Sequence, residues 1–432
     1  MEQETGKYTD QKVELDGRIG NRIKEQTESF LWLEDAVIYD ILPDRFASSW
    51  KKLDYIREDN EEESGENKTY GGTIQGIIEN MDYLLKLGIN CISLNPFIKE
   101  GSEMPQASLG DHIHPKLGTD KDFAFLVGLA HNCNFRVILK GFELHLRSFL
   151  KGSLKEPEIL SDEDTMELSK QCNHWLTDYK MDGILIDKDN ISDVFFKELC
   201  SLISSISPDC VVLINDLTGK EEGNTNQLFE GSIDNGFHWN IRDFFGHNKL
   251  DAYEFAQNSK NHIEKEECKC YTIRYMNSKD TSRFLCDCEE KPERYYLAIL
   301  YWMTSPGIPL LLYGDEQQAC CASEQGNLPQ MEWDEESDLF HFIKAAIFVR
   351  KKLSSLRHGK YRVISAERGS SLFVYERYSP EDCITIILNA GSREEELESS
   401  IGKKTVIWQF GLMENKLEPY GFAMLREKLV QE

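Results

Sequence analysis

Residues 181–187 read MDGILID, an apolar run that ends on a carboxylate, Asp187. A run that is nearly continuous in apolar residues is typical of a parallel strand covered on both faces. The carboxyl ends of such strands are where α/β proteins gather their functional groups. The stretch therefore predicts a buried parallel strand with a candidate site residue at its end. A helix cap or a salt-bridged loop acid is the structural alternative for Asp187.

Similar runs recur along the chain and alternate with helical stretches. The expected strands lie at 37–41, 91–94, 136–139, 183–186, 211–214, 233–237, 271–275 and 309–312. The expected helices lie at 73–87, 121–133, 165–180, 191–204 and 291–303. Eight strands with intervening helices predict a (β/α)8 TIM barrel with insertions. The periodicity also fits a doubly wound open sheet, so that alternative stays open at this point.

The pattern of apolar and turn residues changes after about residue 360. Runs such as DCITIILNAG and KTVIWQF are short strands separated by turn residues, as in a small antiparallel β domain. A chain of 432 residues also exceeds one ordinary core. We expect an N-terminal arm at 1–35, a barrel at 36–355 and a C-terminal β domain at 356–432.

Charge and composition limit the partners. The formal net charge is -26, from 75 acidic and 49 basic residues. A surface of this sign repels phosphate backbones and anionic lipid, so we expect no nucleic-acid and no membrane partner. The apolar run at 295–314 contains Pro306, Gly307 and Pro309 near its middle. It therefore predicts a buried helix, a turn and a strand rather than a membrane span.

The cysteines and the N-terminal residues suggest a compartment. The first 35 residues carry charges throughout and have no apolar secretory core. Twelve cysteines are then most simply reduced thiols in a cytoplasm. Two CxC pairs, at 268–270 and 286–288, lack the spacing of common zinc sites and also fit one face of a strand. We expect a cytoplasmic protein without a metal at these pairs.

Six ordered stretches of the chain resemble the α-amylase family of glycoside hydrolases (glycoside hydrolase family 13), and most of all its neopullulanase and cyclomaltodextrinase branch. The stretches are VIYDILPDRF at 37–46, YGGTIQGIIENMDYLLKLGINCISLNP at 70–96, HPKLGTDKDF at 114–123, MDGILID at 181–187, NSKDTSRF at 277–284 and SPGIPLLLYGDE at 305–316. The resemblance implies a barrel with a loop insertion after strand 3 and a C-terminal antiparallel β-sandwich. The insertion is expected to be short here. The segment at 99–112 lacks the usual tyrosine-bearing loop, and too few residues precede Val37 for the branch's extra domain.

The resemblance assigns roles to residues at strand ends. It places Asp187 at the position of the nucleophile and Asp280 at that of the carboxylate that stabilises the transition state, with Arg283 following. Glycoside hydrolysis of this kind needs a second carboxyl group as proton donor. That position, at the end of strand 5, is Asn215. An amide does not exchange protons usefully, so a factor of roughly 10² to 10⁴ in rate is lost.

Other positions that the resemblance assigns to sugar binding are also changed. Lys140 replaces the aspartate after strand 3, Leu185 replaces the arginine two residues before the nucleophile, and Lys279 replaces a histidine. Leu144 stands where the family has an asparagine that binds calcium, although His145 is retained. Leu144 offers no side-chain oxygen to a metal, so we predict no metal there and no cofactor.

The substitutions change the charge of the predicted site. The family pattern carries three net negative charges, whereas the matching positions here carry one, and Lys279 brings the total to zero. We therefore expect Lys140 to form an ion pair with Asp187 in place of the lost arginine. A less favoured alternative makes Lys140 a Schiff-base or proton-transfer lysine of new chemistry.

The expected function is that of an α-amylase-family homologue in α-glucan metabolism that is catalytically impaired or inactive, a pseudoenzyme. The expected ligand is an α-linked glucooligosaccharide. The alternative is an active hydrolase or transglycosylase with a displaced acid, Asp216 or Glu143. Neighbouring residues of a strand point to opposite sides, so Asp216 should face away from Asn215 unless the strand end bulges.

Overall fold

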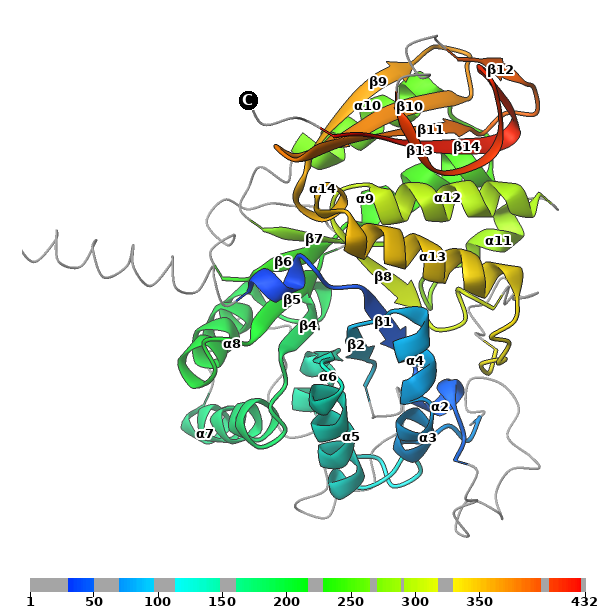
Figure 1. Ribbon diagram of the computed structural model, residues 1–432. Helices are drawn as coiled ribbons and strands as arrows, with labels where there is room; N and C mark the ends of the chain where they lie inside the picture. Colours follow the sequence, from blue (N-terminus) through cyan, green and yellow to red (C-terminus); the bar gives the residue numbers. More distant parts are fainter. Residues whose placement is uncertain are drawn as a thin grey trace, which may run out of the picture.

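A computed structural model describes residues 30–49, 70–96, 113–147, 161–216, 228–264, 270–288, 291–317, 329–397 and 404–428. A barrel of parallel strands is followed by an antiparallel sheet formed by the last part of the chain (Figure 1). Most of the expected N-terminal arm and the whole segment at 99–112 lie outside the described residues. The boundaries expected for the three parts of the chain therefore stay predictions.

Eight parallel strands close into a barrel in sequence order. They are β1 Ile38–Ile41, β2 Cys91–Leu94, β3 Arg136–Lys140, β4 Gly183–Asp187, β5 Val211–Asn215, β6 Gly231–Ile233, β7 Tyr271–Tyr275 and β8 Ile308–Leu312. The first strand pairs in parallel with both β2 and β8. This closure confirms the TIM barrel and excludes the open doubly wound sheet.

The strands are apolar along their whole length because they contact two cores, one inside the barrel and one between the barrel and the helices. Alternate side chains of a barrel strand point inward and outward. In β4, Leu185 belongs to the cluster that fills the barrel, while Ile184 and Ile186 pack against the surrounding helices. Each strand is therefore covered on both faces.

The helical layer follows the predicted pattern with local differences. The helices that flank the barrel are α2 Pro43–Phe46, α3 Ile74–Glu79, α4 Met81–Leu87, α5 Asp120–Asn132, α6 Phe142–Arg147, α7 Asp162–Asn173, α8 Asp193–Ile206, α9 Asn235–Ile241, α10 Ala252–Glu264, α11 Phe284–Asp287, α12 Pro292–Thr304, α13 Asp338–Lys352 and α14 Ser354–His358. Short 3-10 helices lie at η1 Leu31–Leu33 and η4 Lys188–Asn190, and single π turns at η3 His174–Asp178 and η5 Arg242–Gly246. One helix was expected at 73–87, but the chain forms two helices there, α3 and α4. They meet at Asn80, whose side chain donates a hydrogen bond to the Gly76 carbonyl oxygen.

The sixth strand lies earlier than predicted. We expected it at 233–237, but β6 ends at Ile233 and α9 begins at Asn235. Asp234 caps α9 by accepting a hydrogen bond from the Phe237 backbone N–H at 2.8 Å, and aspartate is a favoured N-cap. The start of the strand was not recognised in the sequence because Gly231 has no apolar side chain. Gly231 is needed there because a Cβ would lie 2.8 Å from the Tyr271 carbonyl oxygen.

The last part of the chain forms an antiparallel sheet (Figure 1). Its strands are β9 Lys360–Ala366, β10 Leu372–Tyr378, β11 Asp382–Asn389, β12 Glu395–Glu396, β13 Thr405–Met413 and β14 Lys416–Lys428. The long β14 pairs with β11, β12 and β13, and the sheet buries side chains on both faces. On the barrel side, Arg377 donates to the Thr304 carbonyl at the end of α12. This curled sheet is the predicted C-terminal β domain.

Two further expectations concern membranes and cysteines. The apolar run at 295–314 forms most of α12, a turn and β8, as predicted, and no helix in the described ranges is long and apolar enough to cross a membrane. Eight of the described cysteines are free thiols. Cys286 is disulfide-bonded. The expectation of reduced thiols throughout is therefore wrong for Cys286.

Candidate active site at the barrel mouth

Asp187 and Asn215 lie side by side at the carboxyl ends of β4 and β5. The two residues are register partners, and the Asn215 Nδ2 donates a hydrogen bond to the Asp187 Oδ1 at 2.7 Å. Both side chains are partly buried. The position that would hold a general acid is therefore an amide bound to the neighbouring carboxylate.

A second amide extends this contact across the barrel mouth. Asn235, the first residue of α9, donates to the Asn215 Oδ1 at 3.3 Å and to the Asp216 carbonyl oxygen at 3.5 Å. Its own Oδ1 accepts a hydrogen bond of 2.7 Å from the Tyr275 hydroxyl at the end of β7. The amide orientation of Asn215 is thus fixed from two sides. Neither Asn235 nor Tyr275 was among the predicted site residues, although both stand at strand ends, which was the available signal.

Lys140 forms its ion pair with Asp40 rather than with Asp187. The Lys140 Nζ lies 2.7 Å from the Asp40 Oδ2, and the Asn95 Nδ2 donates to the Asp40 Oδ1 at 2.9 Å. Asp40 and Lys140 both point into the mouth, from β1 and β3. The predicted pairing with Asp187 was wrong because Asp40, a buried carboxylate, needs a cation and Asp187 is already bound by the Asn215 amide.

The charges around Lys140 keep its amine protonated. Burial alone would lower the pKa of Lys140, but the Asp40 carboxylate, with smaller contributions from Asp187 and Asp280, raises it above its usual value. A Schiff-base lysine needs a neutral amine and therefore a lowered pKa. The ion pair with Asp40 and the raised pKa therefore argue against a Schiff-base role for Lys140.

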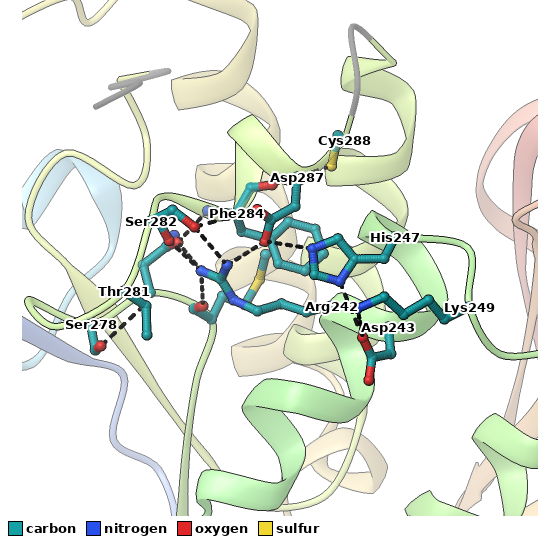
Figure 2. A network of polar contacts seen from close by, with 12 residues as sticks. Arg242, Asp243, His247, Lys249, Ser278, Thr281, Ser282, Phe284, Asp287 and Cys288 are labelled. Atoms are coloured by element: carbon teal, nitrogen blue, oxygen red, sulfur yellow. Dashed lines mark hydrogen bonds and ion pairs between the residues drawn. The ribbon is translucent and has the colours of Figure 1, made fainter. Parts of the chain in front are cut away.

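Asp280 and Lys279 lie in the loop after β7. The buried side chain of Arg242 binds the backbone of this loop (Figure 2). Arg242 donates to the carbonyl oxygens of Ser282 at 2.5 Å and Met276 at 3.4 Å, and it forms an ion pair with Asp287. Asp280 itself is exposed, and Lys279 is partly exposed. The loop therefore presents both charges at the surface while its backbone is fixed.

Arg283 faces away from the solvent. Its side chain is 2% exposed, lies 2.6 Å from the Asp315 Oδ1 and donates to the Tyr313 carbonyl oxygen at 2.6 Å. Asp315 also accepts from the Asn277 amide and from the Leu312 backbone N–H. Arg283 thus anchors the loop after β7 to the turn after β8, and in this conformation it is not a sugar ligand.

The two residues considered as displaced acids lie in different surroundings. Glu143, on α6, is fully buried and accepts hydrogen bonds of 3.4 Å from the Asp187 backbone N–H and the Asn190 Nδ2. Burial, and then the charge of Asp187, raises the pKa of Glu143 to about 7. The Asp216 carboxylate lies 3.9 Å from the Lys188 Nζ. Neither carboxyl group shares the contact between Asp187 and Asn215.

Two further predicted sugar-binding residues are buried. Leu185 is 1% exposed and belongs to the core inside the barrel. His145 is also 1% exposed, and its ring centroid lies 4.9 Å from that of Trp175. Neither side chain offers surface to a ligand in this conformation. No group of three or more His, Cys, Asp and Glu side chains with metal-binding geometry occurs within the described ranges.

Comparison with known proteins agrees with this fold. The α-amylase catalytic domain family matches residues 40–150. A cyclomaltodextrinase from Bacillus sp is 25% identical over 83% of this chain and 73% of its own length. Neopullulanase 2 from Thermoactinomyces vulgaris is 25% identical over 83% of this chain and 70% of its own length. A solved cyclomaltodextrinase structure superposes with a TM-score of 0.72, at 23% identity, over 91% of this chain and 78% of that one.

A closed barrel with carboxylates at the ends of its strands is compatible with a glycoside-hydrolase catalytic domain, although the same architecture serves other reactions as well. The chain is similar to the α-amylase family over residues 40–150, and cyclomaltodextrinases and neopullulanases are among its relatives. The predicted resemblance is confirmed.

Proposed function

We propose that this protein binds α-linked glucooligosaccharides at the barrel mouth in α-glucan metabolism, and that it is catalytically impaired. The observation that carries the proposal is the hydrogen bond from the Asn215 amide to Asp187. A retaining glycosidase needs an acid that protonates the leaving oxygen and later accepts a proton from water. Asn215 does neither, and it occupies one oxygen of the carboxylate in the nucleophile position.

The neighbouring charges support the proposal. Lys140 is bound to Asp40, so the mouth holds an internal ion pair where the family has an aspartate. Because Lys140 stands where the family has an aspartate, the mouth is less negative than the family pattern and stabilises the cationic, oxocarbenium-like transition state of glycoside hydrolysis less well. It remains suited to a neutral sugar, which is bound by hydrogen bonds and aromatic contacts.

The test is to incubate the purified full chain with maltooligosaccharides, cyclodextrin and pullulan and to measure new reducing ends. We expect no turnover above that of the Asp187→Ala variant. Turnover that disappears in Asp187→Ala would contradict catalytic impairment. Isothermal titration with the same sugars measures binding separately, and we expect heat of binding from at least one of them.

A second candidate is an active hydrolase or transglycosylase with a displaced acid. Glu143 favours it, because a pKa of about 7 suits a group that donates a proton near neutral pH. Full burial speaks against it, since the carboxyl group does not reach solvent or ligand in this conformation. If turnover is found, its loss in Glu143→Gln or in Asp216→Asn identifies the acid.

We also propose a cytoplasmic location. Eight free thiols among the described cysteines are typical of a reducing compartment. The disulfide at Cys286 is an observation against a reducing compartment. Cell fractionation followed by thiol labelling of the intact protein tests this directly, and labelling of the eight free cysteines in the cytoplasmic fraction is the expected result.

A further inference from the structure

The helix after β6 exposes one large aromatic side chain beside the barrel mouth. Trp239 of α9 is 54% exposed, whereas Phe237, His238, Asn240 and Ile241 around it are buried. Single exposed apolar side chains are common on protein surfaces. The significance of Trp239 therefore depends on where the helix places it and what supports it.

The start of α9 belongs to the candidate site. Asn235 contacts Asn215, which in turn donates to Asp187. Trp239 follows Asn235 by four residues and so lies on the same side of the helix, about 6 Å further along its axis. The backbone of Trp239 is thus about one helical turn from that of Asn235, which contacts the amide network that ends at Asp187.

The ring of Trp239 is supported by a stack of aromatic rings that leads back to the site. Its centroid lies 4.8 Å from that of His238 in an edge-to-face arrangement. His238 is stacked on Tyr275 at 4.6 Å, and the Tyr275 hydroxyl donates to Asn235. Burial, and then the charge of Arg242, lowers the pKa of His238 to about 3. The support is therefore uncharged at neutral pH and fixed at both ends.

We propose that Trp239 is a stacking platform for a glucosyl unit of the ligand at a distance from the unit at Asp187. The inference rests on the proposed function, because it assumes that the mouth binds an α-glucan. A pyranose ring presents an apolar C–H face, and an exposed indole offers a flat apolar surface with a polar N–H at its edge. Hydrogen-bonding groups at Asn235 and Asp187 together with an adjacent aromatic surface form the combination typical of sugar sites.

The platform makes affinity depend on the length of the ligand. Glucosyl units that occupy the mouth at Asp187 do not cover the Trp239 ring, whereas further units of a longer chain extend over it. We therefore expect the full chain to bind maltoheptaose more tightly than maltose. The Trp239→Ala variant should lose most of this difference, and Trp239→Phe, which keeps an aromatic face, should retain most of it.

Isothermal titration of the full-length wild type and variants with both sugars tests the inference. We expect Trp239→Ala to weaken maltoheptaose binding about tenfold and to leave maltose binding unchanged. Phe125→Ala is the matched control, because Phe125 is an exposed aromatic residue, 61% accessible, on α5. Unchanged thermal unfolding of both variants establishes that they are folded.

The outcomes separate the two proposals. If the wild type binds maltoheptaose and Trp239→Ala binds it equally well, the platform is refuted while the proposed sugar binding stands. If the variant loses affinity for maltose and maltoheptaose alike, Trp239 acts through the mouth itself, and a platform for more distant units is refuted. If the wild type binds none of the sugars, both proposals fail.

Discussion

The Asn215 Nδ2 donates to the Asp187 Oδ1 at 2.7 Å. An amide therefore stands beside Asp187 at the position where the resemblance predicts a second carboxyl group. The same amide receives a hydrogen bond from Asn235 on its oxygen. Donor and acceptor ends of Asn215 are thus both used. This arrangement fixes the orientation of the Asn215 amide beside Asp187, and its contribution to stability can be tested without knowing the ligand.

Replacing Asn215 by aspartate should destabilise the protein in a pH-dependent way. The change keeps the shape of the side chain but sets two carboxyl groups at hydrogen-bonding distance, which raises the pKa of one of them. A carboxyl group whose pKa is raised by folding stabilises the protein at low pH and loses that contribution as the pH rises through the raised value. We expect Asn215→Asp to lose about 1–3 kcal/mol in free energy of unfolding at pH 8 and little at pH 4.

Urea unfolding at the two pH values measures this effect. Asn173→Asp on the exposed side of α7 is the control, because its new charge is solvated, and it should show no such difference. An equal loss at both pH values for Asn215→Asp would mean that packing rather than charge is responsible.

The ion pair between Lys140 and Asp40 predicts a second, larger effect. Asp40→Asn leaves the Lys140 ammonium in the mouth without its main partner, and a buried charge that loses its partner costs about 3 kcal/mol. The double variant Asp40→Asn with Lys140→Met removes the uncompensated charge. It should be more stable than Asp40→Asn alone in chemical denaturation.

An exposed ion pair provides the comparison. Lys86 and Glu335 are 2.9 Å apart, with side chains 55% and 40% exposed. Exposed pairs of this kind contribute little to stability. Glu335→Gln should therefore leave the unfolding midpoint unchanged, and a loss as large as that of Asp40→Asn would show that the measurement does not report on buried charge.

The sequence was sufficient to predict most of the barrel, because its strands are short apolar runs between helices. The strands at 91–94 and 271–275 were predicted with the observed bounds. The sixth strand was misplaced, because Gly231 has no side chain to signal a strand and the helix that follows begins at once after Asp234. Local sequence patterns thus predicted the strands, except where a glycine and a helix-capping aspartate set the ends of the sixth strand.

The site was predictable in position but not in its pairings. Strand ends identified Asp187, Asn215 and Lys140 as neighbours in the mouth. The choice of Asp40 as the partner of Lys140 depends on how strands far apart in sequence meet across the barrel. The resemblance alone likewise assigned His145 and Arg283 to the sugar site, whereas packing has buried both.

Arg242 should control the order of the loop that carries Asp280. Its guanidinium binds the backbone of Met276 and Ser282 and the Asp287 carboxylate (Figure 2). A lysine offers one compact charge and does not bind these groups together. We expect Arg242→Lys to accelerate hydrogen exchange in residues 276–284 at least tenfold, equivalent to about 1.4 kcal/mol, without a change in β11 or β14.

Hydrogen exchange followed by mass spectrometry measures this loop directly. Arg362→Lys is a matched control, because Arg362 lies in β9 and pairs with Glu376 in the C-terminal sheet, away from the loop. Its exchange pattern in residues 276–284 should equal that of the wild type. Unchanged exchange in Arg242→Lys would refute the role of Arg242, and uniformly faster exchange would show global destabilisation instead.

Glu143 predicts how stability depends on pH near neutrality. Its pKa is about 7 in the folded protein, against about 4.3 for an ordinary glutamate. The folded state therefore holds this proton more tightly, so its contribution to stability is present below about pH 4 and is lost as the pH rises towards 7. The loss amounts to about 4 kcal/mol for a shift of this size. Glu143→Gln keeps a neutral side chain at every pH, so the variant should gain stability relative to the wild type as the pH rises.

Urea unfolding of Glu143→Gln and wild type between about pH 4 and pH 8 gives this difference. Burial also raises the pKa values of Glu230 and Glu316 to about 7, and their contributions remain in the variant. The wild-type curve therefore falls with rising pH for several reasons, but the difference between the two curves isolates Glu143. A difference that stays constant across this range would mean that Glu143 holds no proton at neutral pH. It would also remove the main argument for Glu143 as a displaced acid.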